Sequence, residues 1–292
     1  MLEFTRIEEV RAAARAARAG GSRVGLVPTL GYLHEGHISL CAAARRECGF
    51  VVASIFVNPL QFAPTEDFDS YPRDLVRDLG MLRAAGVDAA FTPSIEEMYP
   101  EPMQSFVSLP ELSRVLEGET RPTHFQGVAT VVLKLLQIAQ PDSIFFGQKD
   151  WQQTAVVRRM VHDLSVPVAV MVVPTVRESD GLALSSRNVH LDASARQRAL
   201  RLFGALSAGR ALLEAGERNA GVVARTMHGV LSEDPAVRPD YAAVVDPKDL
   251  SPLERVTGRV LLAVAAYVGG VRLIDNFVLD VSPGGVRELS PL

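Results

Sequence analysis

The chain has 292 residues, of which 48% are hydrophobic and 22% are charged, a composition typical of a folded globular protein and not of a disordered one. Its length corresponds to about two domains. The 30 Lys and Arg residues and 34 Asp and Glu residues give a net charge of −4, which argues against an obligate nucleic-acid binder because such proteins carry a basic excess.

Signals for export or membrane insertion are missing from this sequence. Its first 21 residues carry acidic side chains early and no apolar signal core. No run of about 18 apolar residues is present, so we expect no membrane span. The two cysteines, Cys41 and Cys48, fit neither a disulfide framework nor a zinc-binding spacing. We therefore expect buried or unreactive thiols in a reducing compartment, and a cytoplasmic protein.

Helical and strand-like patterns alternate over residues 1–175. The Ala- and Arg-rich stretch Ile7–Ala19 predicts a helix that stops at Gly20. We expect strands over 23–27 (ended by Pro28), 50–57, 87–91, 143–146 and 168–173, and helices over 36–48, 74–85, 109–117, 127–139 and 150–164, the last capped by Asp150. Apolar strands that alternate with helices form βαβ units, so we predict an α/β fold with a Rossmann-like, doubly wound parallel sheet.

The character of the sequence changes after about Val176. A polar loop over 177–188 leads into Arg- and Ala-rich helices near 193–215 and 220–231. Three strand-like runs follow, over 241–245, 260–268 and 272–278. We predict a Rossmann-like domain over 1–175 and a smaller C-terminal α/β domain over 176–292.

The loop after the first long strand contains His34, Gly36 and His37. Ligands bind beyond the carboxyl ends of strands in an open parallel sheet, so this loop is a candidate site. Two histidines three residues apart at a helix start lie on one face, where imidazoles and free N–H groups attract phosphate. A metal pair is an alternative, but no Cys, third His or carboxylate set nearby completes one. Two ordinary surface histidines are the other alternative.

A second candidate position is Lys149, which follows the strand expected over 143–146. The chain has only three lysines and otherwise uses Arg for positive charge. A lysine kept at a strand end therefore suggests a compact ammonium group that neutralises phosphate, against the alternative of a solvated surface residue. The neighbouring Asp150 can bind a ribose hydroxyl or cap its helix.

Several further polar side chains are placed to contact a ligand. The loop Ser185, Ser186, Arg187 and Asn188 suits a phosphate clamp, or is an ordinary interdomain loop. Gln61 and Gln153 can orient a polar substrate, or are surface amides. Arg121 can bind a carboxylate or phosphate, or lie in solvent. The sequence contains no Walker loop, no G-x-G-x-x-G fingerprint and no G-x-S-x-G elbow.

These motifs together resemble a known family. The segment over 27–37, with its His-x-Gly-His motif, resembles the signature of the nucleotidyltransferase superfamily that includes class I aminoacyl-tRNA synthetases, and Leu184–Asn188 is similar to its second signature. More narrowly, the chain resembles the pantoate–β-alanine ligases (pantothenate synthetases). The resemblance also includes 54–62, 71–73, 121–127, 145–153, 174–188 and 272–276, and so covers nearly the whole chain.

The resemblance implies a two-step, ATP-dependent ligase. Pantoate carboxylate attacks the α-phosphate of ATP and gives pantoyl adenylate and pyrophosphate. The amine of β-alanine then attacks the adenylate and gives pantothenate and AMP. The resemblance also implies Mg²⁺ with ATP, a homodimer, and a C-terminal domain that acts as a lid, which suits an acyl adenylate because water would hydrolyse it.

The resemblance assigns roles by position. His37 corresponds to the residue usually given as proton donor; with His34, Lys149, Ser185 and Arg187 it makes up the implied catalytic group. Gln61 and Gln153 would hold pantoate, with Gln61 also near β-alanine. The implied ATP-binding residues are Leu30, Gly31, Tyr32, Leu33, His34, Glu35, Gly36, His37, Gly147, Gln148, Lys149, Asp150, Val176, Leu184, Ser185, Ser186 and Arg187.

Two positions depart from the family pattern. Leu30 stands where Met is common, a swap that conserves volume. Gln148 stands where Glu is common, which removes a negative charge beside Lys149. Two other functions stay open: nucleotidyl transfer to a phosphorylated acceptor, which the neutral Gln61 and Gln153 disfavour, and a nucleotide- or RNA-binding module without catalysis, which the acidic net charge disfavours.

Overall fold

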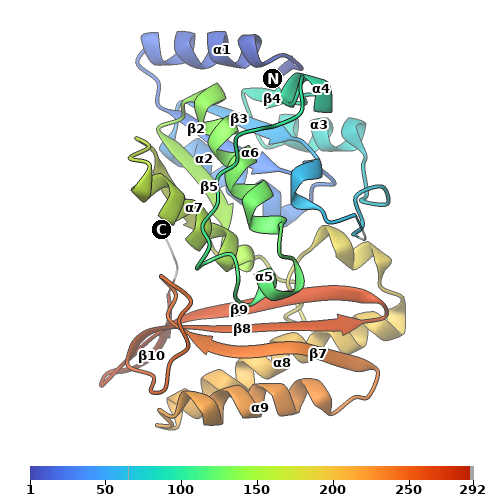
Figure 1. The fold of residues 1–292 in the computed structure, drawn as a ribbon, viewed down its shortest axis with the longest axis vertical. Coiled ribbons are helices and arrows are strands. Elements are labelled where there is room, and N and C mark those ends of the chain that lie inside the picture. The colour runs from blue at the N-terminus through green and yellow to red at the C-terminus, as the bar shows by residue number, and fades with distance from the viewer. Residues whose placement is uncertain (65, 290–292) are drawn as a thin grey trace. The chain divides into compact units, whose positions relative to one another are not determined.

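The computed structural model describes residues 1–64 and 66–289. The chain divides into two compact units (Figure 1). The first unit comprises 1–147 and 152–173. The second comprises the short segment 148–151 together with residues 174–289. Among the described residues, no helix has the length and apolar composition needed to span a membrane.

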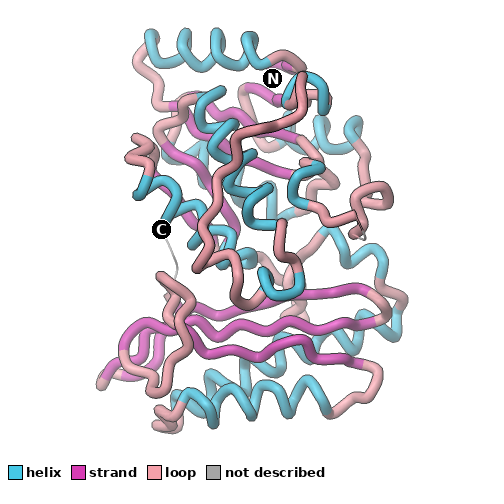
Figure 2. Tube along the Cα trace, in the orientation of Figure 1, coloured by secondary structure: helices cyan, strands magenta, loops and turns pink. Residues whose placement is uncertain are grey.

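A parallel sheet, whose strands are magenta in Figure 2, forms the centre of the first unit. It has six strands in the order β1-β4-β3-β2-β5-β6. Its strands are β1 (Leu2–Phe4), β2 (Val24–Thr29), β3 (Phe50–Ile55), β4 (Ala89–Phe91), β5 (Ser143–Gly147) and β6 (Ala169–Val173). The chain runs outward from β2 to β3 and β4, then crosses back to β5 on the other side of β2. The order therefore reverses between β2 and β5, the place where doubly wound sheets bind ligands. The predicted Rossmann-like sheet is confirmed.

Helices cover both faces of this sheet. Those of the first unit are α1 (Ile7–Ala19), α2 (Glu35–Glu47), α3 (Leu75–Ala84), α4 (Ile95–Met98), α5 (Glu117–Thr120), α6 (His124–Ala139) and α7 (Trp151–Asp163), whose first residue groups with the second unit. On one face α2 packs over β2, β3 and β5 and α3 packs beside α2, with a core that includes Val27, Leu82 and Phe145. On the other face α1 and α6 pack together against β2. Cys41 and Cys48 are buried free thiols, as expected, and burial raises the pKa of Cys41 to about 12.

Strand β2 differs from its prediction because it continues through Pro28 to Thr29. Pairing with β5 ends at Leu26, so the N–H that proline lacks is not needed on that side. On the other side Pro28 pairs with Ser54, and the Thr29 hydroxyl donates to the Ser54 carbonyl at 2.8 Å. The added residues carry the strand directly into the loop of the two histidines.

The prediction of a helix over 109–117 is wrong. The segment forms turns, followed by the short α5, and Leu116 has a positive φ of 52°. The side-chain amide of Gln152 donates to the carbonyls of Leu112 and Val115, both at 2.8 Å, and the Val115 carbonyl also accepts the Gly118 N–H at 2.9 Å. A side chain from a distant part of the sequence thus helps to hold these turns, and the sequence pattern of 109–117 carries no sign of it.

The second unit is an antiparallel sheet covered by helices. Its strands are β7 (Val237–Val245), β8 (Gly258–Val268), β9 (Val271–Ser282) and β10 (Gly285–Glu288), in the order β10-β9-β8-β7. Helices α8 (Ala193–Glu214) and α9 (Ala220–Ser232) pack on it, with Leu206, Met227 and Leu262 in the shared core. Strand β9 also contacts two short 3-10 helices, η2 (Gln148–Asp150) and η3 (Ser186–His190). Strands β1 and β10 are additions to the sequence-based prediction.

Candidate active site

The first part of the site is the loop between β2 and α2. Gly31 and Tyr32 both have positive φ, 88° and 50°, which turns the chain sharply so that His34 caps the N-terminus of α2. The Gly36 N–H donates to His34 Nδ1 at 3.1 Å, and the His34 N–H donates to His37 Nδ1 at 3.2 Å. The two imidazole rings lie side by side, with centroids 4.1 Å apart. The sequence-based pairing of these histidines on one face is therefore correct.

These hydrogen bonds determine where each ring carries its proton. A backbone N–H only donates, so Nδ1 of both His34 and His37 accepts. Each neutral ring therefore has its hydrogen on Nε2. Two N–H donors with defined tautomers at a helix N-terminus can bind a phosphate oxygen and stabilise charge that develops on it.

Asp78 holds this loop in place from α3. Its side chain is almost fully buried, and its two oxygens accept the backbone N–H groups of Tyr32 and Leu33, each at 2.7 Å. Successive N–H groups in such a turn form a natural anion site, here filled by a carboxylate of the chain itself. Arg77, next to Asp78, stacks over the Tyr32 ring at 5.3 Å.

A second group of the first unit surrounds Gln61. This residue ends η1 (Pro59–Gln61), and its side-chain oxygen accepts from Asn58 Nδ2 at 3.1 Å. Asn58 is buried; its Nδ2 also donates to the Gly127 carbonyl, and its Oδ1 accepts from the Tyr99 hydroxyl and the Leu60 N–H. Gly127 lies so close to η1 that a Cβ there would stand 2.1 Å from the Leu60 carbonyl oxygen.

The backbone carbonyl of Gln61 binds two side chains. His124 Nδ1 lies 2.9 Å from it and Arg121 Nη2 lies 3.3 Å from it. Burial and the adjacent Arg121 guanidinium lower the pKa of His124 to about 4, so this ring is neutral at pH 7. It then donates from Nδ1 to the carbonyl, and Nε2 faces Arg121 Nη1 at 3.3 Å. Arg121 also forms a two-pronged ion pair with Glu66, at 2.8 and 2.7 Å, and so binds a carboxylate of the chain itself.

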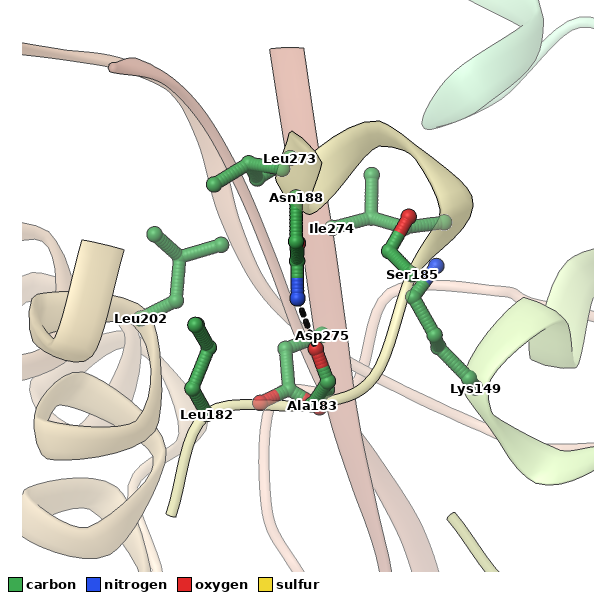
Figure 3. Close-up of a pocket in the computed structure, with 9 residues that line it drawn as sticks. All are labelled: Lys149, Leu182, Ala183, Ser185, Asn188, Leu202, Leu273, Ile274 and Asp275. Carbon is green, nitrogen blue, oxygen red and sulfur yellow. Dashed lines mark hydrogen bonds between the residues drawn. The ribbon is translucent and has the colours of Figure 1, made fainter. Parts of the chain in front are cut away.

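Lys149 belongs to the second unit, although it follows β5 directly in sequence. Figure 3 shows its side chain beside Ser185 at a small pocket, with room for about one water molecule. The pocket is lined by Lys149, Leu182, Ala183, Ser185, Asn188, Leu202, Leu273, Ile274 and Asp275. Lys149 Nζ lies 3.7 Å from the exposed carboxylate of Asp150. An ammonium and a hydroxyl thus share one pocket, a combination suited to an anionic oxygen.

Hydrogen bonds order the loop that carries Ser185 and Arg187. Its two sides pair as a hairpin, and the Leu184 N–H donates to the Val176 carbonyl at 3.0 Å. Ser185 Oγ accepts the Arg187 N–H at 3.2 Å and caps η3. Asn188 Nδ2 donates to the Ala183 carbonyl at 3.1 Å (Figure 3).

Among the described residues, no group of three or more His, Cys, Asp and Glu side chains is arranged to hold a metal ion. In that part of the chain, His34 and His37 belong to no such group. Mg²⁺ bound mainly through nucleotide phosphates and water needs at most one or two carboxylates. The side chains of this chain are compatible with an ion that enters together with ATP.

Comparisons with known proteins decide the family. The sequence model of the family described as Pantoate-beta-alanine ligase matches residues 3–278. A pantothenate synthetase of Moorella thermoacetica is 54% identical over 276 residues, which cover 94% of this chain and 98% of that protein. One of Chloroflexus aurantiacus is 53% identical, over 91% of this chain and 95% of that protein. The chain belongs to the pantoate-beta-alanine ligase family.

Solved structures agree with this family assignment. A crystal structure of pantothenate synthetase from Thermus thermophilus matches with a TM-score of 0.90 at 48% identity, covering 97% of this chain and 100% of that one. The pantoate-beta-alanine ligase of Francisella tularensis, solved in complex with "Beta-gamma ATP" and β-alanine, matches with a TM-score of 0.77 at 33% identity, over 95% and 97% of the two chains. Both matches extend over the two units, so the whole fold is that of the family.

The site residues predicted from the sequence fall into two sets. The loop over 30–37 lies in the first unit with Gln61, Gly147 and the half-buried Gln153 of α7. The residues over 148–150, Val176 and the segment over 184–187 lie in the second unit. The structure thus brings together His34 with His37, and Lys149 with Ser185.

Sequence reasoning missed the residues that hold these groups. Asp78, Asn58 and His124 are examples in the first unit, and Asp275 and Asn276 in the second. One signal was available: Asp78 stands four residues before the buried Leu82, on the same face of an amphipathic helix, where a carboxylate needs partners.

Proposed function

We propose that this protein condenses pantoate with β-alanine to pantothenate at the expense of ATP. In the first step a pantoate carboxylate oxygen bonds to the α-phosphorus, and the bond from that phosphorus to the bridging oxygen breaks, with pyrophosphate as the leaving group. In the second step the β-alanine amine bonds to the acyl carbon, loses a proton, and AMP leaves. The observation that carries this proposal is the match to pantothenate synthetases over 94% of the chain at 54% identity.

The first unit would bind ATP and pantoate. His34 and His37 would donate from Nε2 to the ATP phosphates, with His37 as the proton donor. The residues over 30–37 and Gly147 would line the nucleotide. Gln61 and Gln153 would hold pantoate through their amides, and Gln61 would also contact β-alanine. The hydrogen bonds at Nδ1 of both histidines support this role because they fix donors before the substrate arrives.

The second unit would supply positive charge to the transition state. Lys149, Ser185 and Arg187 would stabilise charge on the α-phosphate, and Gln148, Asp150, Val176, Leu184 and Ser186 would contact the rest of the nucleotide. The shared pocket of Lys149 and Ser185 supports this assignment. We further propose that the segment over 176–292 acts as a lid that excludes water from the adenylate. Mg²⁺ bound with ATP would neutralise phosphate charge, and the enzyme would work in the cytoplasm.

The test is pyrophosphate release from Mg-ATP, measured with and without pantoate and β-alanine. We expect release that requires pantoate, and continuous AMP formation only with β-alanine. Lys149→Ala and His37→Ala should each lower turnover by about 100-fold or more while the circular dichroism spectrum stays native. Lys248→Ala, at the lysine of another loop, is the matched control and should keep full turnover. Pantoate-independent release, or a stable dinucleotide product, would overturn the proposal.

A further inference from the structure

We propose that Asp275 and Asn276, neighbours on β9, are positioning residues that hold both phosphate-facing segments of the second unit on one strand. The segments are η2, which carries Lys149, and the loop over 177–188, which carries Ser185 and Arg187. The inference rests on the proposed function for the role of Lys149.

Asn276 holds η2. Its side chain is buried, and Nδ2 donates to two successive backbone carbonyls, those of Gln148 at 3.1 Å and Lys149 at 2.8 Å. One amide nitrogen therefore fixes the peptide units on either side of the Lys149 Cα. The adjacent Trp151 indole donates to the Pro247 carbonyl at 2.8 Å, which secures the segment at its other end.

Asp275 holds the loop. Its buried carboxylate forms a two-pronged ion pair with Arg177, at 2.6 and 2.9 Å. Arg177 also donates to the Gly181 carbonyl at 3.0 Å, and its guanidinium lies 5.0 and 5.2 Å from the ring centres of Phe203 and Phe277. The start of the loop and its turn are thereby fixed to β9 through one guanidinium.

The two side chains reach different segments because successive residues of a strand point to opposite faces. Asp275 shares the face of Leu273 and Phe277, which pack in the core with α8, and Asn276 points the other way. Since both residues belong to one rigid strand, the relative placement of Lys149 and Ser185 is determined by β9. Lys149, Ser185 and Asp275 all line the pocket of Figure 3.

The side chain of Asn276 has an unfavourable feature that argues for a positioning role. Its side-chain oxygen is buried and has no hydrogen-bond partner in the described part of the chain. An unsatisfied buried acceptor lowers stability, and an apolar residue would suit this interior strand better. The amide is therefore explained by what its nitrogen holds.

The experiment uses the full-length protein with Asn276→Leu, which keeps the size of the side chain and removes the donors. We expect kcat for pantoate-dependent pyrophosphate release to fall by about 10- to 100-fold, with KM for pantoate changed less than about 2-fold, because a misplaced catalytic group costs rate more than binding. In the Lys149→Ala background, measured at single turnover, the same substitution should cost less than about 2-fold, since the group it positions is absent. Arg177→Lys, which breaks the two-pronged pair, should likewise lower kcat.

Val281→Ala is the matched control, because Val281 is a buried core residue of the same strand and pairs with Val286 and Gly258. It should reduce thermal stability and leave kcat within about 2-fold of wild type. Hydrogen exchange of peptides over 148–151 gives a readout independent of catalysis: Asn276→Leu should accelerate it by about 10-fold, and Val281→Ala should not. Unchanged exchange in Asn276→Leu, or an equal loss of kcat with and without Lys149, would overturn the inference. If the wild-type protein itself releases no pantoate-dependent pyrophosphate, the proposed function fails and the exchange data alone decide the positioning role.

Discussion

At the scale of single residues, His124 shows how burial determines the protonation state of a side chain. Its ring is neutral because burial and Arg121 lower its pKa to about 4, and in that form it donates to the Gln61 carbonyl. An unfolded chain would bind a proton at this histidine near pH 6.5. Between these two values the unfolded state holds more protons than the folded state, so the free energy of unfolding decreases as the pH falls.

We therefore predict that the contribution of His124 to the free energy of unfolding is fully present above about pH 6.5. The free energy of unfolding should fall by on the order of 3 kcal/mol as the pH approaches 4. His124→Asn retains a side-chain N–H near the Nδ1 position and removes the titration, so its stability should depend less on pH in this range. Urea unfolding from pH 4 to 8 measures the difference. His162→Asn, at an exposed histidine, serves as control. Equal pH dependence in wild type and His124→Asn would contradict the prediction.

A second prediction at this scale concerns Asp78. Asp78→Asn replaces one acceptor by an NH₂ group that faces a backbone N–H, so the loop of Tyr32 and Leu33 loses one of its two anchors. We expect a loss of about 1–3 kcal/mol in stability and a rise of about 10-fold or more in KM for ATP.

Thermal unfolding and initial rates against ATP concentration test the effect of Asp78→Asn. The control is Asp74→Ala, which removes the N-cap of the same helix and should lower stability by about 0.5–2 kcal/mol without changing KM for ATP. An Asp78→Asn enzyme with the wild-type KM would show that the loop keeps its shape unaided.

At the scale of elements, the contact between α6 and η1 depends on one glycine. A Cβ at Gly127 would meet the Leu60 carbonyl carbon and oxygen and the Gln61 nitrogen at 2.1–2.5 Å, and all three are backbone atoms that cannot rotate away. Gly127→Ala should therefore destabilise the protein by at least about 2 kcal/mol and raise KM for pantoate, since η1 carries Gln61.

Gly229→Ala is the opposite case within a helix. Among the described residues, nothing beyond the adjacent residues and the backbone of α9 itself lies within 4 Å of a Cβ at this exposed position, so the change should stabilise the protein by up to about 1 kcal/mol through helix propensity. Chemical denaturation of both variants measures the contrast. Similar effects of the two substitutions would contradict the proposed contact between α6 and η1.

The elements with a strong local pattern were predictable, and those made by distant contacts were not. Helix Ile7–Ala19 has the predicted bounds because its composition and stop signal are local. The turns over 109–117 are held in part by the distant Gln152, whose amide donates to two of their carbonyls. Strands β1 and β10 have three and four residues, too few for a periodic pattern to be evident.

The candidate site divides in the same way. His34, His37 and Lys149 stand at strand ends, and the sequence could locate them because ligand sites follow strand ends in this architecture. The residues that hold these side chains in place come from distant parts of the sequence. Asp78 lies 46 residues after Tyr32, whose N–H it accepts, and Asn276 lies 127 residues after Lys149, to whose carbonyl it donates. Nothing local in a sequence records such pairings.

At the scale of the whole molecule, we predict a homodimer, as the family resemblance implies. The chain has a mass of 31.6 kDa, so light scattering at micromolar concentration should give about twice this value. Dilution to nanomolar concentration serves to find the dissociation range. A mass of one chain at micromolar concentration would contradict the prediction.

The segment 148–151 belongs to the second unit, whereas the residues on either side of it in the sequence belong to the first. Its Gln148 and Lys149 carbonyls accept hydrogen bonds from a strand more than 120 residues further along the chain. For protein engineering this changes where the molecule can be recombined. A chimera of two relatives with a single crossover near residue 175 joins η2 of one parent to β9 of the other, and so places the lysine of one enzyme on the scaffold of another. An exchange that keeps the native contacts has to move the segment 148–151 together with residues 174–289.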